Sequence, residues 1–138
     1  MDSKPISMTE ACRRTGISSH TLRYYEGAGL LKNVDRSRAG RRIYRERDLQ
    51  WLEMLKVLRG TGMSIRRIRQ LAAMVEQGDA SLEARIAFFG DWQAELRQQI
   101  TLRQQALATI GKKIARHTAL LEDLKAGRKR KLPCITKP

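Results

Sequence analysis

The chain has 138 residues, which is room for one domain and an extension but not for a large core. Its 28 Lys and Arg against 14 Asp and Glu give a net charge of +14, and a protein this basic attracts polyanions. The two cysteines lie far apart, which excludes a disulfide framework and indicates a reducing cytoplasm. No stretch approaches the ~20 apolar residues of a membrane span, and no apolar run typical of a signal peptide follows the start.

The first predicted helix covers residues 8–15 and follows a short polar arm, residues 1–5. Ser7 and Glu10 fit a capping box, in which the Ser7 hydroxyl accepts from a helix amide and the Glu10 side chain reaches back. We therefore expect Ser7 to be the cap at which this helix begins.

The apolar face of the first helix places Cys12 in the predicted core. Met8, Ala11 and Cys12 recur at i, i+3 and i+4, and a free cysteine is commonly buried. Arg13 and Arg14 point away from that face, so both are candidate contacts to phosphate.

A second helix is predicted over about residues 18–28, after a tight turn. Gly16 suits a turn position with positive φ, Ser18 is a good N-cap, and Gly29 ends the helix. A helix-turn-helix of this kind places the N-terminal end of its second helix in the major groove of DNA.

The second helix carries the groups that bond phosphate oxygens and base edges: a hydroxyl, a guanidinium and two phenols. Leu22 faces the core and Tyr25 lies near that face, so one of the two tyrosines can be mainly structural. His20 is either a base contact or a solvated histidine. The predicted DNA contacts of this helix are Ser19, His20, Thr21, Arg23, Tyr24 and Tyr25.

Residues 32–45 favour a small β-hairpin with its turn near residues 37–40. Six arginines against the single Glu46 fall between residues 36 and 47, so they cannot all be neutralised locally. A basic hairpin beside a recognition helix is a wing, which reaches flanking phosphate or the minor groove; a merely solvated basic loop is the alternative. The predicted contacts of the wing are Arg38, Arg41, Arg42 and Tyr44.

A third helix is predicted over residues 46–60 and a fourth after the cap Ser64, with Gly60 and Gly62 breaking the chain between them. Arginines in the first turn of the fourth helix oppose its dipole, which is understandable if that end lies near phosphate. Arg66 is therefore a further candidate contact.

Two linked motifs, T-x-R-Y-Y-E-x-x-G-L at residues 21–30 and G-x-R-x-Y at residues 40–44, resemble the MerR family of bacterial transcription regulators. The resemblance is strong over about residues 6–78 and in outline beyond. It implies a mainly α fold, in which a winged helix-turn-helix DNA-binding domain precedes a long dimerisation helix. It also implies that this helix pairs with that of a second copy as an antiparallel coiled coil.

The last third of the chain carries a heptad seam, which is typical of a coiled coil. Thirteen positions between residues 82 and 124 follow at alternating steps of four and three, and ten of them are apolar. So narrow a stripe needs a partner, and a second copy is expected to supply it; pairing with the fourth helix is the alternative. The predicted dimer contacts are Leu82, Ile86, Phe89, Leu96, Ile100, Leu107, Ile110 and Ile114.

Two polar seam residues, Arg103 and His117, are expected to set the register of the coiled coil. For His117 the alternative is a pH-sensitive or ligand-facing group. The basic run from Arg128 to Lys131 is expected to be disordered, with or without a role in attracting phosphate.

By the same resemblance, metal sensors of the family carry paired cysteines near the end of the dimerisation helix, and residues 79–133 contain none. Cys134 alone cannot build the multi-ligand site that zinc or copper takes, so we expect no metal and no cofactor. The chain looks most like the subgroup that responds to aldehydes and thiol stress. However, Val57 stands where that subgroup has its third-helix cysteine.

No enzyme is expected, because the sequence has neither a phosphate-binding glycine loop nor a nucleophile set, and its two histidines fall on different elements. The predicted function is a cytoplasmic, nucleoid-associated regulator that binds a pseudo-palindromic promoter operator as a dimer, distorts the spacer DNA and acts on RNA polymerase indirectly. Whether a small-molecule effector regulates the protein is left open by the sequence. The alternatives are an architectural or repressor dimer without an effector, and a coiled-coil adaptor for protein or RNA. The predicted divisions are 1–5, 6–78, 79–125 and 126–138, the last a basic tail.

Overall fold

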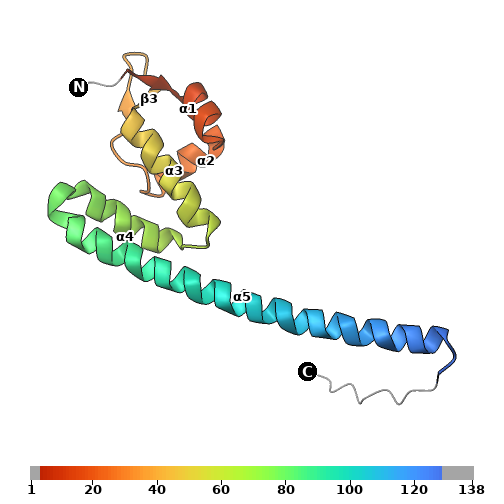
Figure 1. Cartoon of the computed structure of the whole chain (residues 1–138). Helices are drawn as coiled ribbons and strands as arrows, with labels where there is room; N and C mark the ends of the chain where they lie inside the picture. The colour runs from red at the N-terminus through yellow and green to blue at the C-terminus, as the bar shows by residue number, and fades with distance from the viewer. Residues whose placement is uncertain (1–3, 129–138) are drawn as a thin grey trace. The chain divides into compact units, whose positions relative to one another are not determined.

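The computed structural model describes residues 4–128, which form five α-helices, three short strands and a 3-10 turn (Figure 1). The chain divides into two compact units, one reaching Asp91 and the other beginning at Trp92. The elements in chain order are β1 (Ile6–Ser7), α1 (Met8–Thr15), α2 (Ser19–Gly27), β2 (Asp35–Arg36), β3 (Arg42–Tyr44), α3 (Glu46–Gly60), α4 (Ile65–Glu76), η1 (Gly78–Ser81) and α5 (Leu82–Lys125).

The helix-turn-helix of α1 and α2 begins and ends where its capping residues predict. The Ser7 hydroxyl accepts from the Glu10 amide at 3.1 Å, and the Ser18 hydroxyl accepts from the Thr21 amide at 3.1 Å. Gly16, between the helices, has φ +74°, a left-handed conformation that glycine adopts without strain. The predicted capping box is wrong in one part: the Glu10 carboxylate binds Arg13 instead of reaching back to the cap.

The hairpin is confirmed, and it belongs to a three-stranded antiparallel sheet of order β1-β3-β2. The Gly40 amide donates to the Ser37 carbonyl at 2.9 Å and the Ser37 amide to the Arg41 carbonyl at 2.7 Å, which closes the turn. Strand β1 was not predicted, because two residues are too short to show the alternation of a strand. It pairs Ile6 with Tyr44 and so joins the start of the chain to the wing.

The core of the first unit lies between the helix-turn-helix, α3 and α4. Cys12 is only half-buried, so the prediction that it belongs to the core is wrong, while Ala11 and Thr15 fill the inner face of α1. The large apolar side chains that are fully buried come from α2, β3, α3, α4 and the loops that follow α2 and α3: Leu22, Leu30, Leu31, Tyr44, Leu52, Leu55, Leu58, Met63, Ile68 and Leu71.

Tyr44 is 0% exposed, and its phenol oxygen has no hydrogen-bond partner among the described residues. Its predicted contact with DNA is therefore wrong: the inward face of β3 holds the ring in the core. Burial disfavours the phenolate and, with the nearby Glu26 carboxylate, raises the pKa of Tyr44.

Tyr44→Phe is expected to stabilise the protein by about 1 kcal/mol, because a buried hydroxyl without a partner costs about 1–3 kcal/mol. The melting temperature should then rise by a few degrees, as measured by circular dichroism. A fall in melting temperature would show that the hydroxyl makes a stabilising bond in solution.

The first unit takes in the beginning of α5, past the predicted division at residue 78. Phe88 is 9% exposed, and the Arg67 guanidinium carbon lies 5.7 Å from the centre of its ring, a cation–π contact. Ser81 donates to the Gly78 carbonyl at 2.8 Å inside η1. The segment between α4 and α5 is thus a hydrogen-bonded turn, in which Ser81 is buried.

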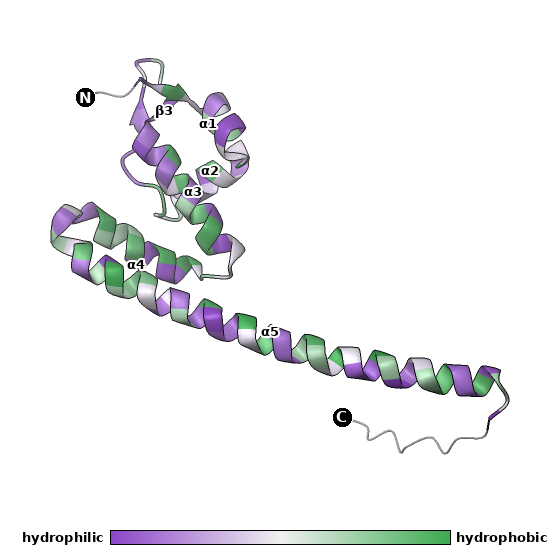
Figure 2. Ribbon diagram, in the orientation of Figure 1, coloured by the Kyte–Doolittle hydropathy of each residue, from purple (hydrophilic) through white to green (hydrophobic). Residues whose placement is uncertain are grey.

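The second unit contains most of α5, and Figure 2 shows apolar residues recurring along it. The helix is continuous from Leu82 to Lys125, through both Gly90 and Gly111, as predicted. Ile100, Leu107 and Ile114 are more than half exposed in the single chain. None of the described helices combines the length and apolar character that crossing a membrane requires.

Candidate nucleic-acid interface

Helix α2 has one buried face and one polar, exposed face. Leu22 is 0% exposed and Tyr25 8%, whereas Tyr24 is 54% exposed. His20 and Arg23 are exposed with Tyr24. Of the two tyrosines, Tyr25 is therefore the mainly structural one, which the sequence had left open, and Tyr24 is the one available to a ligand.

The exposed face continues onto the N-terminal end of α2. Ser18 Oγ, which caps the helix, also donates to Thr21 Oγ1 at 2.9 Å, and this bond orients the Thr21 hydroxyl. Ser19 is exposed beside them. The end of the helix thus presents short hydroxyl side chains together with the positive pole of the helix dipole, an arrangement that favours anionic groups.

The wing is neutralised at its base and left positively charged at its tip. Arg42 Nε lies 2.5 Å from Glu26 Oε2, and Arg45 Nε lies 3.5 Å from Asp35 Oδ2. Arg38 and Arg41 are exposed and make no ion pair within residues 4–128. The tip therefore offers two guanidinium groups to an anionic ligand.

Glu26 is a positioning residue that the sequence did not single out. It sits at the end of α2, binds Arg42 and lies 3.8 Å from Arg36 Nη2, so one carboxylate connects α2 to both strands of the wing. The available signal was its place in the T-x-R-Y-Y-E motif. Arg42, predicted as a DNA contact, is half-buried in this link and is less free than Arg38 or Arg41.

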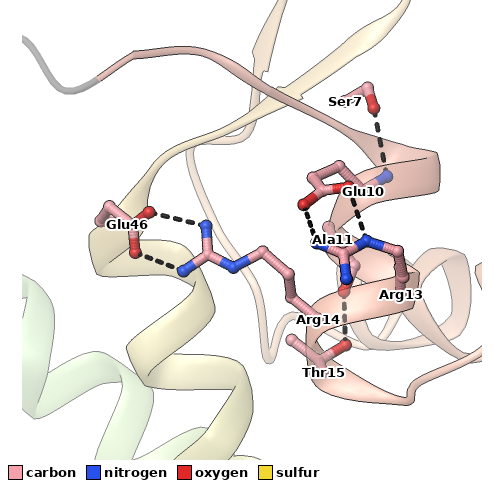
Figure 3. Close-up of polar contacts among 7 residues, drawn as sticks. All are labelled: Ser7, Glu10, Ala11, Arg13, Arg14, Thr15 and Glu46. Atoms are coloured by element: carbon pink, nitrogen blue, oxygen red, sulfur yellow. Dashed lines mark hydrogen bonds and ion pairs between the residues drawn. The ribbon is translucent and has the colours of Figure 1, made fainter.

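The two arginines of α1 already have carboxylate partners (Figure 3). Arg14 binds Glu46 of α3 through two bonds of 2.7 and 2.9 Å, and Arg13 pairs with Glu10. Each pairing holds the pKa of its carboxyl, Glu46 or Glu10, below the usual value, chiefly through the hydrogen bonds from arginine. As candidate phosphate contacts they are therefore weaker than their exposure suggests, because each must leave or share a partner.

The arginines at the start of α4 divide into two roles. Arg67 lies over Phe88, and Arg69 donates to the Ala28 carbonyl at 2.7 Å, so both stabilise the fold. Arg66 is exposed and pairs with no other described residue. Of the three arginines it is the one that stays a candidate contact to phosphate.

Within residues 4–128, no group of three or more His, Cys, Asp and Glu side chains could hold a metal ion. Cys134 and most of the basic run from Arg128 to Lys131 fall beyond the described residues. Val57, at the position where the resemblance places a reactive cysteine, is 58% exposed on α3.

Comparison with known proteins places these features in a family. Residues 6–75 match the MerR HTH family regulatory protein. An uncharacterized HTH-type transcriptional regulator of Haemophilus influenzae is 37% identical over 106 residues, which cover 77% of this chain and 78% of that protein. The HTH-type transcriptional regulator AdhR of Bacillus subtilis is 34% identical over 86 residues, 62% of this chain and 61% of that protein.

Among solved structures, the crystal structure of HiNmlR superposes with a TM-score of 0.75 and 32% identity, covering 91% of this chain and 97% of that one. HiNmlR is described as a MerR family regulator lacking the sensor domain, bound to promoter DNA. The family match and these relatives identify a DNA-binding transcription regulator, as predicted. The chain belongs to the MerR family, and its predicted fold class is confirmed.

Proposed function

We propose that two copies of this chain bind one promoter operator, each with α2 in the major groove and the β2–β3 wing on the flanking backbone. The observation that carries the proposal is that Tyr24 on α2 and Arg38 and Arg41 on the wing are all exposed. The two arginines make no ion pair within residues 4–128, and Glu26 connects α2 to the wing through its ion pairs with Arg36 and Arg42. Because the Glu26 ion pairs link α2 to the wing, phosphate contacts of one element also fix the position of the other along the duplex.

The dimer is proposed to form through α5. The large apolar residues of its seam are exposed in the single chain, except for the half-buried Leu96, and apolar surface of this extent is typical of a protein–protein interface. A second α5, antiparallel by resemblance to the family, would cover them. The seam residues proposed for the interface are Leu82, Ile86, Phe89, Leu96, Ile100, Leu107, Ile110 and Ile114.

The two polar residues of the α5 seam, Arg103 and His117, can serve in the dimer interface without binding a ligand. His117 Nδ1 lies 2.8 Å from the Lys113 carbonyl of its own helix, which fixes the orientation of the ring. We therefore keep His117 and Arg103 as residues that set the register of the two helices. The proposed divisions are residues 6–78 for DNA binding and 79–125 for dimerisation, flanked by the arm 1–5 and the tail 126–138.

Two recognition helices in one dimer would enter successive major grooves, about 34 Å apart or a multiple of that distance. Bending the intervening spacer costs of order 1–6 kcal/mol, which several phosphate contacts per dimer can offset. The distorted spacer would realign the two elements that RNA polymerase recognises, so the effect on polymerase is indirect. The protein is proposed to act on the chromosome in the bacterial cytoplasm.

An architectural or repressor dimer without an effector is the second candidate. It is favoured by the likeness to HiNmlR, a regulator described as lacking the sensor domain. Transcription from the operator promoter in vitro, with and without candidate inducers, separates the two. Output that changes with an inducer supports the regulated form, and constant output supports the second candidate.

Tyr24→Phe is expected to weaken operator binding about tenfold, because it removes a hydroxyl whose bond to an ionised phosphate contributes about 1.5 kcal/mol. Tyr25→Phe is the matched control: it removes the same atom one residue away, from a side chain only 8% exposed. Fluorescence anisotropy with labelled operator measures both affinities. Equal losses for the two variants would contradict the assignment of the exposed face of α2.

A further inference from the structure

A pocket of about 270 Å³ lies within the first unit, where the segment that follows α2 meets α3 and α4. Its apolar wall includes Trp51 of α3 and Ala72 and Val75 of α4. The Trp51 indole nitrogen donates to the Leu30 carbonyl at 2.6 Å, which orients the ring. Because its one polar atom is already bonded, the indole presents an apolar surface to a ligand.

The charged groups that line the pocket balance one another, although the whole chain carries +14. Lys32 and Glu76 form an ion pair of 3.2 Å, so these two groups satisfy each other. Arg47 and Asp48 lie in the first turn of α3, and within residues 4–128 neither forms an ion pair. The pocket therefore combines one unpaired cation and one unpaired anion with an apolar wall.

The Asp48 carboxylate is the group of this pocket that most needs a partner. Asp48 is 7% exposed, and the Arg45 amide donates to its Oδ2 at 2.8 Å, while Oδ1 has no donor within residues 4–128. Burial raises the pKa of Asp48 by more than the Arg45 amide and the Arg47 charge lower it. A ligand ammonium at Oδ1 would supply the missing charge-assisted bond.

The pocket also borders the connection between the reading helix and the wing. Helix α2 ends at Gly27 and strand β2 begins at Asp35, and residues 30–33 line the pocket between them. Asn33 has φ +60°, the one positive φ outside glycine within residues 4–128. Asparagine tolerates this left-handed conformation better than most residues, but it still carries strain. A ligand in the pocket thus contacts the strained segment that leads into the wing.

From these observations we propose that the pocket binds one small zwitterion with an apolar side chain, the chemistry of a free α-amino acid such as leucine. Its ammonium lies on Asp48, its carboxylate on Arg47 and its side chain on Trp51. The two carboxylates of the lining disfavour a phosphate or other simple anion, and Arg47 repels a simple cation. On the basis of the proposed function, the ligand holds residues 30–33 in place and so raises operator affinity, since less freedom is lost when DNA binds.

Binding is measured first on the full chain without DNA. L-Leucine or L-phenylalanine at saturation should raise the melting temperature of wild-type protein by a few degrees. It should also change the fluorescence of Trp51 in the Trp92→Phe variant, where Trp51 is the only tryptophan left. Isothermal titration should give a Kd of roughly 10 µM to 1 mM. Glycine, 3-methylbutylamine and 4-methylpentanoate, which lack the side chain, the carboxylate and the ammonium of leucine, should each bind at least about tenfold more weakly.

Two variants should change this preference in opposite ways. Asp48→Asn keeps an oxygen for the Arg45 amide but loses the charge, so it should bind leucine no better than 4-methylpentanoate. Arg47→Gln should bind leucine no better than 3-methylbutylamine. Arg97→Gln is the matched control, because Arg97 is an exposed arginine of α5 that does not line the pocket. This variant should keep the preference of wild-type protein.

Saturating leucine should then raise the affinity of wild-type protein for its selected operator about three- to tenfold. By linkage, the operator should tighten leucine binding by the same factor. No binding of either amino acid to wild-type protein, or equal binding of the ligands with a single charge, would overturn the proposed site. An operator affinity that leucine leaves unchanged would overturn its regulatory role. Failure of the protein to prefer any duplex would instead overturn the proposed function, while amino-acid binding measured without DNA would still support the site.

Discussion

Replacing Ile100 by aspartate should dissociate the dimer and lower operator affinity by about 10²–10⁴-fold. Ile100 lies at the middle of the α5 seam and is 55% exposed in the single chain, so the charge can be hydrated there. In the dimer the same carboxylate would lose its water without gaining a partner, which is strongly unfavourable. Each half-site would then be bound separately, and the gain from two linked binding modules would be lost.

Gln98→Asp is the matched control, because it adds the same charge two residues away, at an exposed position outside the seam. Sedimentation equilibrium should show a monomer for Ile100→Asp and a dimer for Gln98→Asp, with helical content unchanged in both. A dimer that survives the Ile100 change would place the interface somewhere other than this seam.

Operator affinity should also fall by about 10³–10⁵-fold between 50 and 200 mM salt, the range for a protein that makes 6–10 phosphate contacts. Four of the predicted DNA contacts in the first unit, Arg23, Arg38, Arg41 and Arg66, are exposed arginines without an ion pair within residues 4–128, which makes eight for a dimer. Each phosphate that is neutralised releases counterions, so the logarithm of affinity should fall linearly with the logarithm of salt concentration.

Anisotropy titrations at five or six salt concentrations give the slope directly. Paired arginines such as Arg14 should contribute little, so Arg14→Ala should leave the slope almost unchanged while Arg41→Ala makes it shallower. A shallow slope for wild-type protein, corresponding to only two or three contacts, would contradict an interface based on these arginines.

The ends of the helices could be predicted because their signals are local. Ser7, Ser18 and Ser64 each accept from the amide of the third residue of the helix that they cap. Gly16 and Gly40 adopt the positive φ that their turns need. Such features depend on a few neighbouring residues, which a sequence displays directly.

Apart from the Glu10 side chain, which binds the nearby Arg13, the errors concern contacts between residues distant in the chain. Arg14 and Glu46 lie 32 positions apart in the sequence, and the residues next to them give no signal that the two side chains pair. Tyr44 lies between Arg42 and Arg45 in a basic hairpin, and only the packing of β3 on the core decides which side chains face inward. The same dependence on packing assigns Tyr24 to the surface and Tyr25 to the core, although the two are neighbours.

The most direct test of the central claim, a sequence-specific dimer on promoter DNA, is selection of genomic fragments by the purified protein followed by footprinting of the enriched site. We expect one pseudo-palindrome, protected on one face of the duplex at two major grooves about one helical turn or a multiple apart, between two promoter elements. Enrichment of fragments with no common site would show that the basic surface dominates binding, and would contradict the sequence-specific regulator.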